Sequence, residues 1–209
     1  AMRARFDPAD PQGDLDAAAA LATDPRLAAM VVHHRALAAV DARRYAEAWQ
    51  LSNEAHDAFL AADSPRGALD TLFPRVDALH ATGRGEEAEA ASTEAIRLAR
   101  SLDDLRGLGI AYATRGYAAE SFADTLADQQ RALDVLDTVG DINASVRIRL
   151  GRARLQDMAG FPCEPLEALI AWADELGQPR LAERARLEAA AAALHQGRID
   201  AMAAWLDGL

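Results

Sequence analysis

The chain contains no lysine, and all 22 of its basic residues are arginine. It carries 33 acidic residues, so its formal net charge is −11 at pH 7. An acidic surface repels the phosphate backbone of nucleic acids, so direct nucleic-acid binding is not expected. The single cysteine, Cys163, cannot form an internal disulfide and fits a reducing cytoplasm. The arginine bias indicates a GC-rich, bacterial source, and we expect a cytoplasmic protein.

Long apolar runs are also missing. No uncharged stretch has the length that a membrane-spanning helix needs, so no membrane association is expected. The first residues, "AMRARFDPADPQGD", lack the apolar centre of a signal peptide. Ala1 precedes Met2 and is interpreted as a vector remnant. We expect residues 1–13 to be a flexible tail, residues 13–24 to include a short capping helix, and residues 14–209 to form one domain, which a longer protein could contain.

Aromatic residues make up only 5% of the chain and β-branched residues are few, whereas alanine is abundant. Alanine, leucine, arginine and glutamate all favour the helix, so the composition predicts an all-α fold. Two similar segments indicate an internal repeat: "ALHATGRGEEAEA" at residues 78–90 and "ALHQGRIDAMAA" at residues 193–204. Each joins two apolar runs through a glycine turn.

The period of this repeat follows from three Pro-Arg pairs that begin apolar runs, at Pro25, Pro65 and Pro179. A turn follows each arginine by 17 residues. With two more degenerate copies, the repeats begin near residues 26, 66, 103 to 106, 143 and 180. This period predicts about five helical hairpins, each of which buries its apolar face against its neighbours. The predicted repeats are 25–63, 64–102, 103–140, 141–177 and 178–208.

Small residues recur in the second helix of these repeats, at Ala55, Ala95 and Ala132, where they would let helix axes approach closely. With the preceding turns, the segments "ARRYAEAWQLSNEA" (42–55), "TGRGEEAEAASTEA" (82–95) and "FADTLADQQRA" (122–132) resemble the tetratricopeptide repeat, in the longer-helix form of bacterial regulators. The resemblance extends from residue 25 to about residue 207 and is poorest in the fourth repeat. It implies a right-handed α-solenoid whose first helices line a concave groove.

The resemblance also implies which residues face this groove. We expect one end to be acidic and aromatic and the other basic, which suits an extended peptide or a helix of a protein partner. The expected groove residues are Met30, His33, Asp70, Phe73, Asp77, Tyr117, Arg147, Arg154 and Arg184.

The arginine-rich segment "RIRLGRAR" (147–154) has two interpretations. In the first, its arginines pair with carboxylates of adjacent helices, as surface arginines commonly do. In the second, Arg147 and Arg154 share one helix face and bind an acidic group of a partner. The carboxylates considered for the first interpretation are Asp134, Asp137, Asp174 and Glu175.

No motif for catalysis, a metal or a cofactor is found in the sequence. The segment "RGLGIAYATRG" (106–116) has Tyr112 where a dinucleotide-binding loop needs its third glycine. His33 and His34 are adjacent, so on a helix they point to different faces and cannot share a metal. Cys163 has no neighbouring cysteine or histidine. We therefore predict that the protein is not an enzyme and uses no cofactor and no metal.

Trp205 lies close to the end of the chain, and we expect an exposed ring that contacts a downstream segment or a second copy in a homodimer. The expected function is that of a non-catalytic protein–protein interaction module in a bacterial signalling or transcription-regulating protein. The alternative is a sensory domain that binds a small molecule or a signal peptide and controls, for example, an attached diguanylate cyclase or DNA-binding domain. Partner and pathway are not encoded in any motif.

Overall fold

The computed structural model describes residues 11–160, 166–177 and 179–207. Within these ranges the chain forms eleven helices and no strand, so the all-α prediction is confirmed. None of these helices is long and apolar enough to cross a membrane. Cys163 and most of the predicted tail lie outside the described residues. The helices are α1 (Pro11–Leu21), α2 (Pro25–Asp41), α3 (Tyr45–Ala61), α4 (Pro65–Ala81), α5 (Gly85–Ser101), α6 (Leu105–Ala118), α7 (Phe122–Val139), α8 (Ile142–Met158), α9 (Leu166–Glu175), α10 (Pro179–His195) and α11 (Ile199–Leu206).

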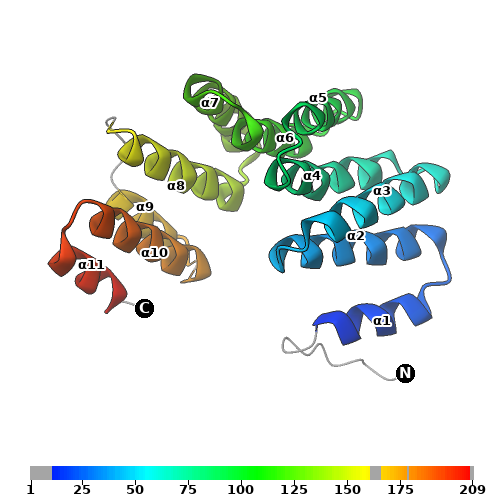
Figure 1. The fold of residues 1–209 in the computed structure, drawn as a ribbon, viewed down its shortest axis with the longest axis horizontal. Coiled ribbons are helices and arrows are strands. Elements are labelled where there is room, and N and C mark those ends of the chain that lie inside the picture. Colours follow the sequence, from blue (N-terminus) through cyan, green and yellow to red (C-terminus); the bar gives the residue numbers. More distant parts are fainter. Residues whose placement is uncertain (1–10, 161–165, 178, 208–209) are drawn as a thin grey trace. The chain divides into compact units, whose positions relative to one another are not determined.

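The helices follow one another in the order that a repeat requires (Figure 1). The first helices of the five predicted repeats, α2, α4, α6, α8 and α10, begin at residues 25, 65, 105, 142 and 179, at intervals of 40, 40, 37 and 37 residues. Most described helices pack on the next one along the chain, and α2 also contacts α4, α4 contacts α6, and α8 contacts α10. This sequential packing is that of a helical repeat, as the periodicity predicted.

The contacts divide the chain into two compact units, with the boundary inside α7 between Asp128 and Gln129. We call them the N-terminal unit and the C-terminal unit. The short helix α1 packs on α2, where an ion pair of 2.6 Å joins Asp16 to Arg35, so the predicted capping helix is confirmed. A single domain over residues 14–209 stays a prediction.

Most turns between the helices share one hydrogen-bond pattern, the Schellman motif. After α2, Arg43 adopts a left-handed conformation with φ 57°. Its N–H donates to the carbonyl of Val40, and the N–H of Arg44 donates to the carbonyl of Ala39. The same pair of bonds closes α3, α4, α5, α7 and α10, with Asp63, Gly83, Asp103, Gly140 and Gly197 as the left-handed residues. The turns predicted at Arg43, Gly83 and Gly197 are therefore confirmed.

The Pro-Arg pairs have a clear structural role. Asp24 caps the N-terminus of α2 by accepting a hydrogen bond from the N–H of Arg26, and Pro25 occupies the first helical position, where no N–H is needed. The Arg26 side chain donates to the carbonyls of Ala62 and Asp63, at the junction before the next repeat. One repeat later, Arg66 forms an ion pair of 3.1 Å with Asp104. Each of these arginines thus ties its helix to the start of the following repeat.

Small residues make close helix contacts in the N-terminal unit, beside larger buried residues such as Leu69 and Leu72. Ala39, Ala48 and Ala78 form one buried cluster, and all three are fully buried. Contact is so close at Gly67 that a Cβ atom there would lie 2.3 Å from the Phe59 ring. The predicted close-contact sites Ala55 and Ala95 are likewise buried, and so is Ala132 in the C-terminal unit, each with at most 1% of its surface exposed.

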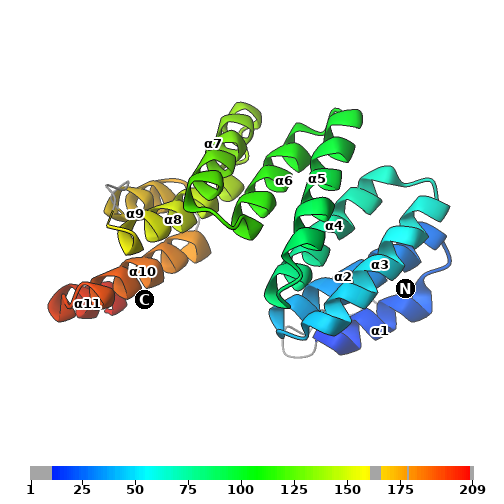
Figure 2. The same ribbon diagram turned by 45° about the horizontal axis from the view of Figure 1, so that its top comes forward.

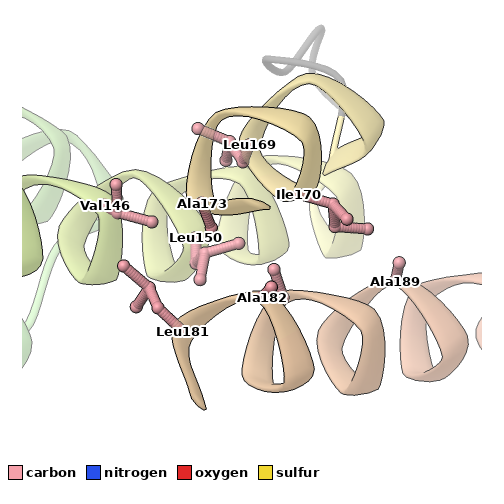
Figure 3. Packing of buried hydrophobic residues seen from close by; sticks show 9 residues of the cluster. Val146, Leu150, Leu169, Ile170, Ala173, Leu181, Ala182 and Ala189 are labelled. Atoms are coloured by element: carbon pink, nitrogen blue, oxygen red, sulfur yellow. The ribbon is translucent and has the colours of Figure 1, made fainter. Parts of the chain in front are cut away.

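The C-terminal unit has a cluster in which aliphatic side chains pack together with alanines. Val146 and Leu150 of α8 meet Leu169 of α9 and Leu181 of α10 in one buried cluster (Figure 3), around which α8, α9 and α10 gather (Figure 2). Trp205 packs against this cluster and is only partly exposed. The prediction of an exposed Trp205 ring is therefore wrong. Helix α11, which carries Trp205, packs back onto α10, so that part of the ring is buried. A dimer contact at this end stays a prediction.

Candidate functional site

The first helices of the N-terminal unit expose matching positions of the repeat. Met30 and Asp70 occupy one position of the 40-residue period, and Leu37, Asp77 and Tyr117 occupy another, seven residues further on. Seven residues make almost two helical turns, so both positions lie on the same side of their helices. All five residues are exposed, among them Met30 at 43%, Leu37 at 37% and Tyr117 at 46%. We call these five residues the first-helix face.

Two further predicted groove residues border this face without being fully exposed. His33 and Phe73 share one repeat position and are both half-buried. The Nδ1 atom of His33 is buried and makes no hydrogen bond. Burial, and to a lesser extent the neighbouring His34, lower the pKa of His33 to about 4. At neutral pH His33 is therefore an uncharged ring beside the face.

Asp70 lies in a group of mixed charge. The surrounding protein atoms, and next the Asp104 carboxylate, raise the pKa of Asp70, while Arg66 and Arg106 act in the opposite direction. The Arg66 guanidinium is already held by Asp104 at 3.1 Å. The Asp70 carboxylate is thus incompletely stabilised as an anion, and a cationic group of a bound partner would stabilise it further.

The predicted basic end of the groove lies in the C-terminal unit. Arg147 and Arg184 are exposed on α8 and α10, and Arg154 forms an ion pair of 3.2 Å with Glu188. Because these residues and the first-helix face belong to different units, a single groove that joins them stays a prediction.

The ion-pair interpretation of "RIRLGRAR" is correct for part of the segment. Arg149 pairs with the predicted partner Asp137, at 2.8 Å. Arg152 donates instead to the side chain of Gln130. Asp174, another expected partner, pairs with Arg186 of α10 at 2.6 Å.

A cavity of about 260 Å³, partly open to solvent, lies in the C-terminal unit and was not predicted from the sequence. The side chain of Ser145 is 1% exposed, and its hydroxyl makes no hydrogen bond. The Arg149 guanidinium lies 5.9 Å from the centre of the Trp172 ring, at a distance typical of a cation–π contact. The residues that line this cavity are Leu136, Asp137, Gly140, Ile142, Ser145, Arg149 and Trp172.

No local motif could have revealed this cavity, because its residues come from α7, the following turn, α8 and α9. A smaller cavity of about 200 Å³ is lined in part by Trp205, and next to it Gln196 donates to Asp157. Leu37 was likewise missed by the sequence analysis, although the position it shares with Asp77 and Tyr117 follows from the 40-residue period.

Comparison with known proteins identifies no family: the chain matches no protein-family model, and no curated protein sequence is similar to it.

Proposed function

We propose that the protein is a non-catalytic interaction module of a bacterial cytoplasmic signalling or transcription-regulating protein, built on tetratricopeptide-like hairpins. In this proposal a peptide or helix of a protein partner lies across the first-helix face. The observation that carries the proposal is that equivalent positions of the repeats differ in how much their residues vary. The contact positions keep alanine from repeat to repeat, whereas the exposed positions change from Met30 and Leu37 to Asp70 and Asp77 and then to Tyr117.

Such a face provides what peptide recognition needs. Exposed apolar and aromatic side chains supply contact area, while carboxylates between them select orientation and charge. The helices that carry the face contact one another, α2 with α4 and α4 with α6, so the side chains are held on a rigid support. A partner segment with apolar residues around a basic one would complement it.

A non-catalytic role is supported by the way in which buried polar groups are used. The His56 ring bonds to the Thr71 hydroxyl at 3.0 Å and to the carbonyl of Ala68 at 3.1 Å, inside the α3–α4 interface. The guanidinium of Arg115 on α6 donates hydrogen bonds to both carboxylate oxygens of Asp128, at 2.6 and 2.7 Å. These groups hold helices together, which leaves the exposed face as the place for binding.

The test is selection of random peptides displayed on phage against the immobilised protein, followed by binding measurements with the purified peptides. The double variant Leu37→Ser and Tyr117→Ser removes the apolar ends of the face. We expect it to weaken binding about tenfold, which corresponds to about 1.4 kcal/mol. The matched control is Leu60→Ser on α3, because Leu60 is 52% exposed and lies outside the face.

Peptides that bind the double variant and the wild type equally would contradict the proposal. The variant Arg147→Ala with Arg154→Ala tests the predicted basic end in the same assay. Weaker binding with unchanged far-UV helicity would extend the binding region to α8, and unchanged binding would restrict it to the first-helix face.

The alternative function, a sensory domain for a small molecule, is favoured by a different observation, the cavity in the C-terminal unit.

A further inference from the structure

Each first helix of the N-terminal unit presents one kind of side chain at the two positions that define the first-helix face. The residues at these positions are Met30 and Leu37 on α2, the exposed Asp70 and Asp77 on α4, and the half-buried Ile110 and the exposed Tyr117 on α6. Ile110 belongs to this set because Met30, Asp70 and Ile110 are each the sixth residue of their helix. The surface therefore has an acidic stripe on α4 between two apolar stripes, one on α2 and one on α6.

Asp70 supplies the negative charge on which this arrangement depends. Burial and the Asp104 carboxylate raise the pKa of Asp70, and the nearby arginines do not fully compensate for this. Arg66 is held by Asp104 at 3.1 Å, and Arg106 also interacts within the protein. The anionic form of Asp70 would thus gain from one more positive charge. Asp77 has an interaction of its own within the protein, so the charge of Asp77 is not needed for this argument.

The surface around Asp70 is apolar along the face. Met30 is 43% exposed on one side of the acidic stripe, and the half-buried Ile110 lies on the other. Between the two positions of the face, α4 presents the half-buried Phe73 and α2 presents the His33 ring, which is uncharged at neutral pH. Apolar contacts on both sides of an ion pair exclude water from it and so strengthen it.

The distance between the stripes selects the conformation of the partner. Helix α4 contacts both α2 and α6, and the axes of helices in contact lie roughly 8–10 Å apart. An extended chain covers this distance in about three residues, at about 3.3 Å per residue. A partner helix would need about seven residues, at about 1.5 Å per residue. An extended segment that crosses the three helices therefore meets all three stripes within about seven residues.

From this arrangement we propose that the partner segment is extended and carries an arginine or lysine with a large apolar residue three positions before it and another three positions after it. The basic residue pairs with Asp70, and the apolar residues lie against Met30 and Ile110. This inference rests on the proposed peptide-binding function and adds to it the chemistry and the spacing of the peptide.

The first experiment varies the spacing and needs no protein variant. The probe is a fluorescently labelled serine–glycine peptide with leucine at its third and ninth positions and arginine at its sixth, and its binding to the full chain is measured by fluorescence anisotropy. We expect a Kd on the order of 100 µM. A peptide whose leucines lie two positions from the arginine should bind at least threefold more weakly. The same should hold for an alanine-rich helical peptide that carries the three residues seven positions apart.

The second experiment tests the charge by a double-mutant cycle. Citrulline has nearly the shape of arginine without its charge, so the citrulline peptide should bind the wild type about threefold more weakly. In Asp70→Asn the arginine and citrulline peptides should bind equally, because the pairing is lost from both sides of the cycle. Asp57→Asn is the matched control, since Asp57 is an exposed carboxylate of α3 outside the face, and it should keep the threefold preference.

Four results would overturn the inference: no binding of the probe at about 1 mM, tightest binding by the two-position or the helical peptide, equal binding of the arginine and citrulline peptides to the wild type, or an unchanged arginine preference in Asp70→Asn. Far-UV circular dichroism checks that the variants are folded. If Asp70→Asn is unfolded, the spacing and citrulline measurements on the wild type decide.

The phage-selected peptides separate this inference from the proposed function. Selected peptides that bind the Leu37→Ser and Tyr117→Ser double variant more weakly but contain no basic residue between apolar ones would support the function and overturn the inference alone. Selected peptides that bind the double variant and the wild type equally would contradict the function, and the inference with it.

Discussion

The two compact units repeat one helical hairpin, and their buried clusters differ in composition. In the N-terminal unit one cluster consists of Ala39, Ala48 and Ala78 alone, beside others that include large residues such as Leu79. In the C-terminal unit one large cluster combines alanines with Leu150, Leu169 and other aliphatic residues. Alanine has no rotatable side chain, so an alanine contact fixes the helix spacing and leaves little void. A leucine contact buries more apolar surface, so the loss of one such side chain is felt more strongly.

The exposed positions of the N-terminal unit vary along the repeat, from Met30 to Asp70 and Tyr117. In the C-terminal unit Arg149 and Trp172 line a cavity that is partly open to solvent. The peptide binding that we propose uses the variable exposed positions and not the buried contacts.

The largest expected effect comes from removing a large contact residue in the C-terminal unit. Leu150 is 2% exposed and lies at the centre of the α8–α9–α10 cluster. Leu150→Ala should lower the free energy of unfolding by about 3 kcal/mol, because it loses buried apolar surface and leaves a cavity. Urea denaturation measures this loss, and hydrogen exchange should accelerate in α8 to α10 more than in α2 to α5.

The control for this variant is Leu187→Ala on α10, because Leu187 is 47% exposed and should cost little. Equal acceleration of exchange in all helices would contradict the distinction between the units. It would show that both unfold as one cooperative body.

A smaller effect is expected from the opposite change in the N-terminal unit. Ala78 is fully buried between Ala39 and Ala48, so Ala78→Leu should destabilise by about 2 kcal/mol through overpacking. The control is Ala90→Leu, since Ala90 is exposed on α5. If Ala78→Leu were as stable as the control, the alanine contacts would be loose and the comparison between the units would fail.

The sequence predicts local features better than tertiary ones. The period, the Pro-Arg helix starts and the alanine contacts were predictable because each depends on residues close in the chain. The junction between α6 and α7 was not, because Ser121 and Asp124 form a capping pair there instead of a glycine turn. The exposure of Trp205 was predicted wrongly, because its ring is partly buried by the packing of α11 on α10, which is a tertiary contact.

The candidate sites show the same limit. Asp70, Asp77 and Tyr117, which the resemblance placed in a groove, lie on exposed positions of α4 and α6. On α8, helical spacing singled out Arg147 and Arg154, whereas Arg149 lines a cavity. Which of several arginines on one helix faces a cavity depends on the helices packed around it, and spacing within the helix contains no such information.

The smallest expected effect concerns the turns, where the repeats again differ. The left-handed position holds glycine at Gly83 and Gly197 but aspartate at Asp63, whose φ is 49°. A side chain in this conformation costs about 1 kcal/mol, and glycine avoids that cost but has greater entropy when unfolded. Asp63→Gly should therefore stabilise the chain by about 0.5 kcal/mol, and it retains the backbone carbonyl that Arg26 binds. Thermal and urea unfolding measure the gain, with Asp63→Asn as the control that removes the charge alone. A loss of stability would mean that the Asp63 carboxylate, close to the N-terminus of α4, stabilises that helix more than its backbone conformation costs.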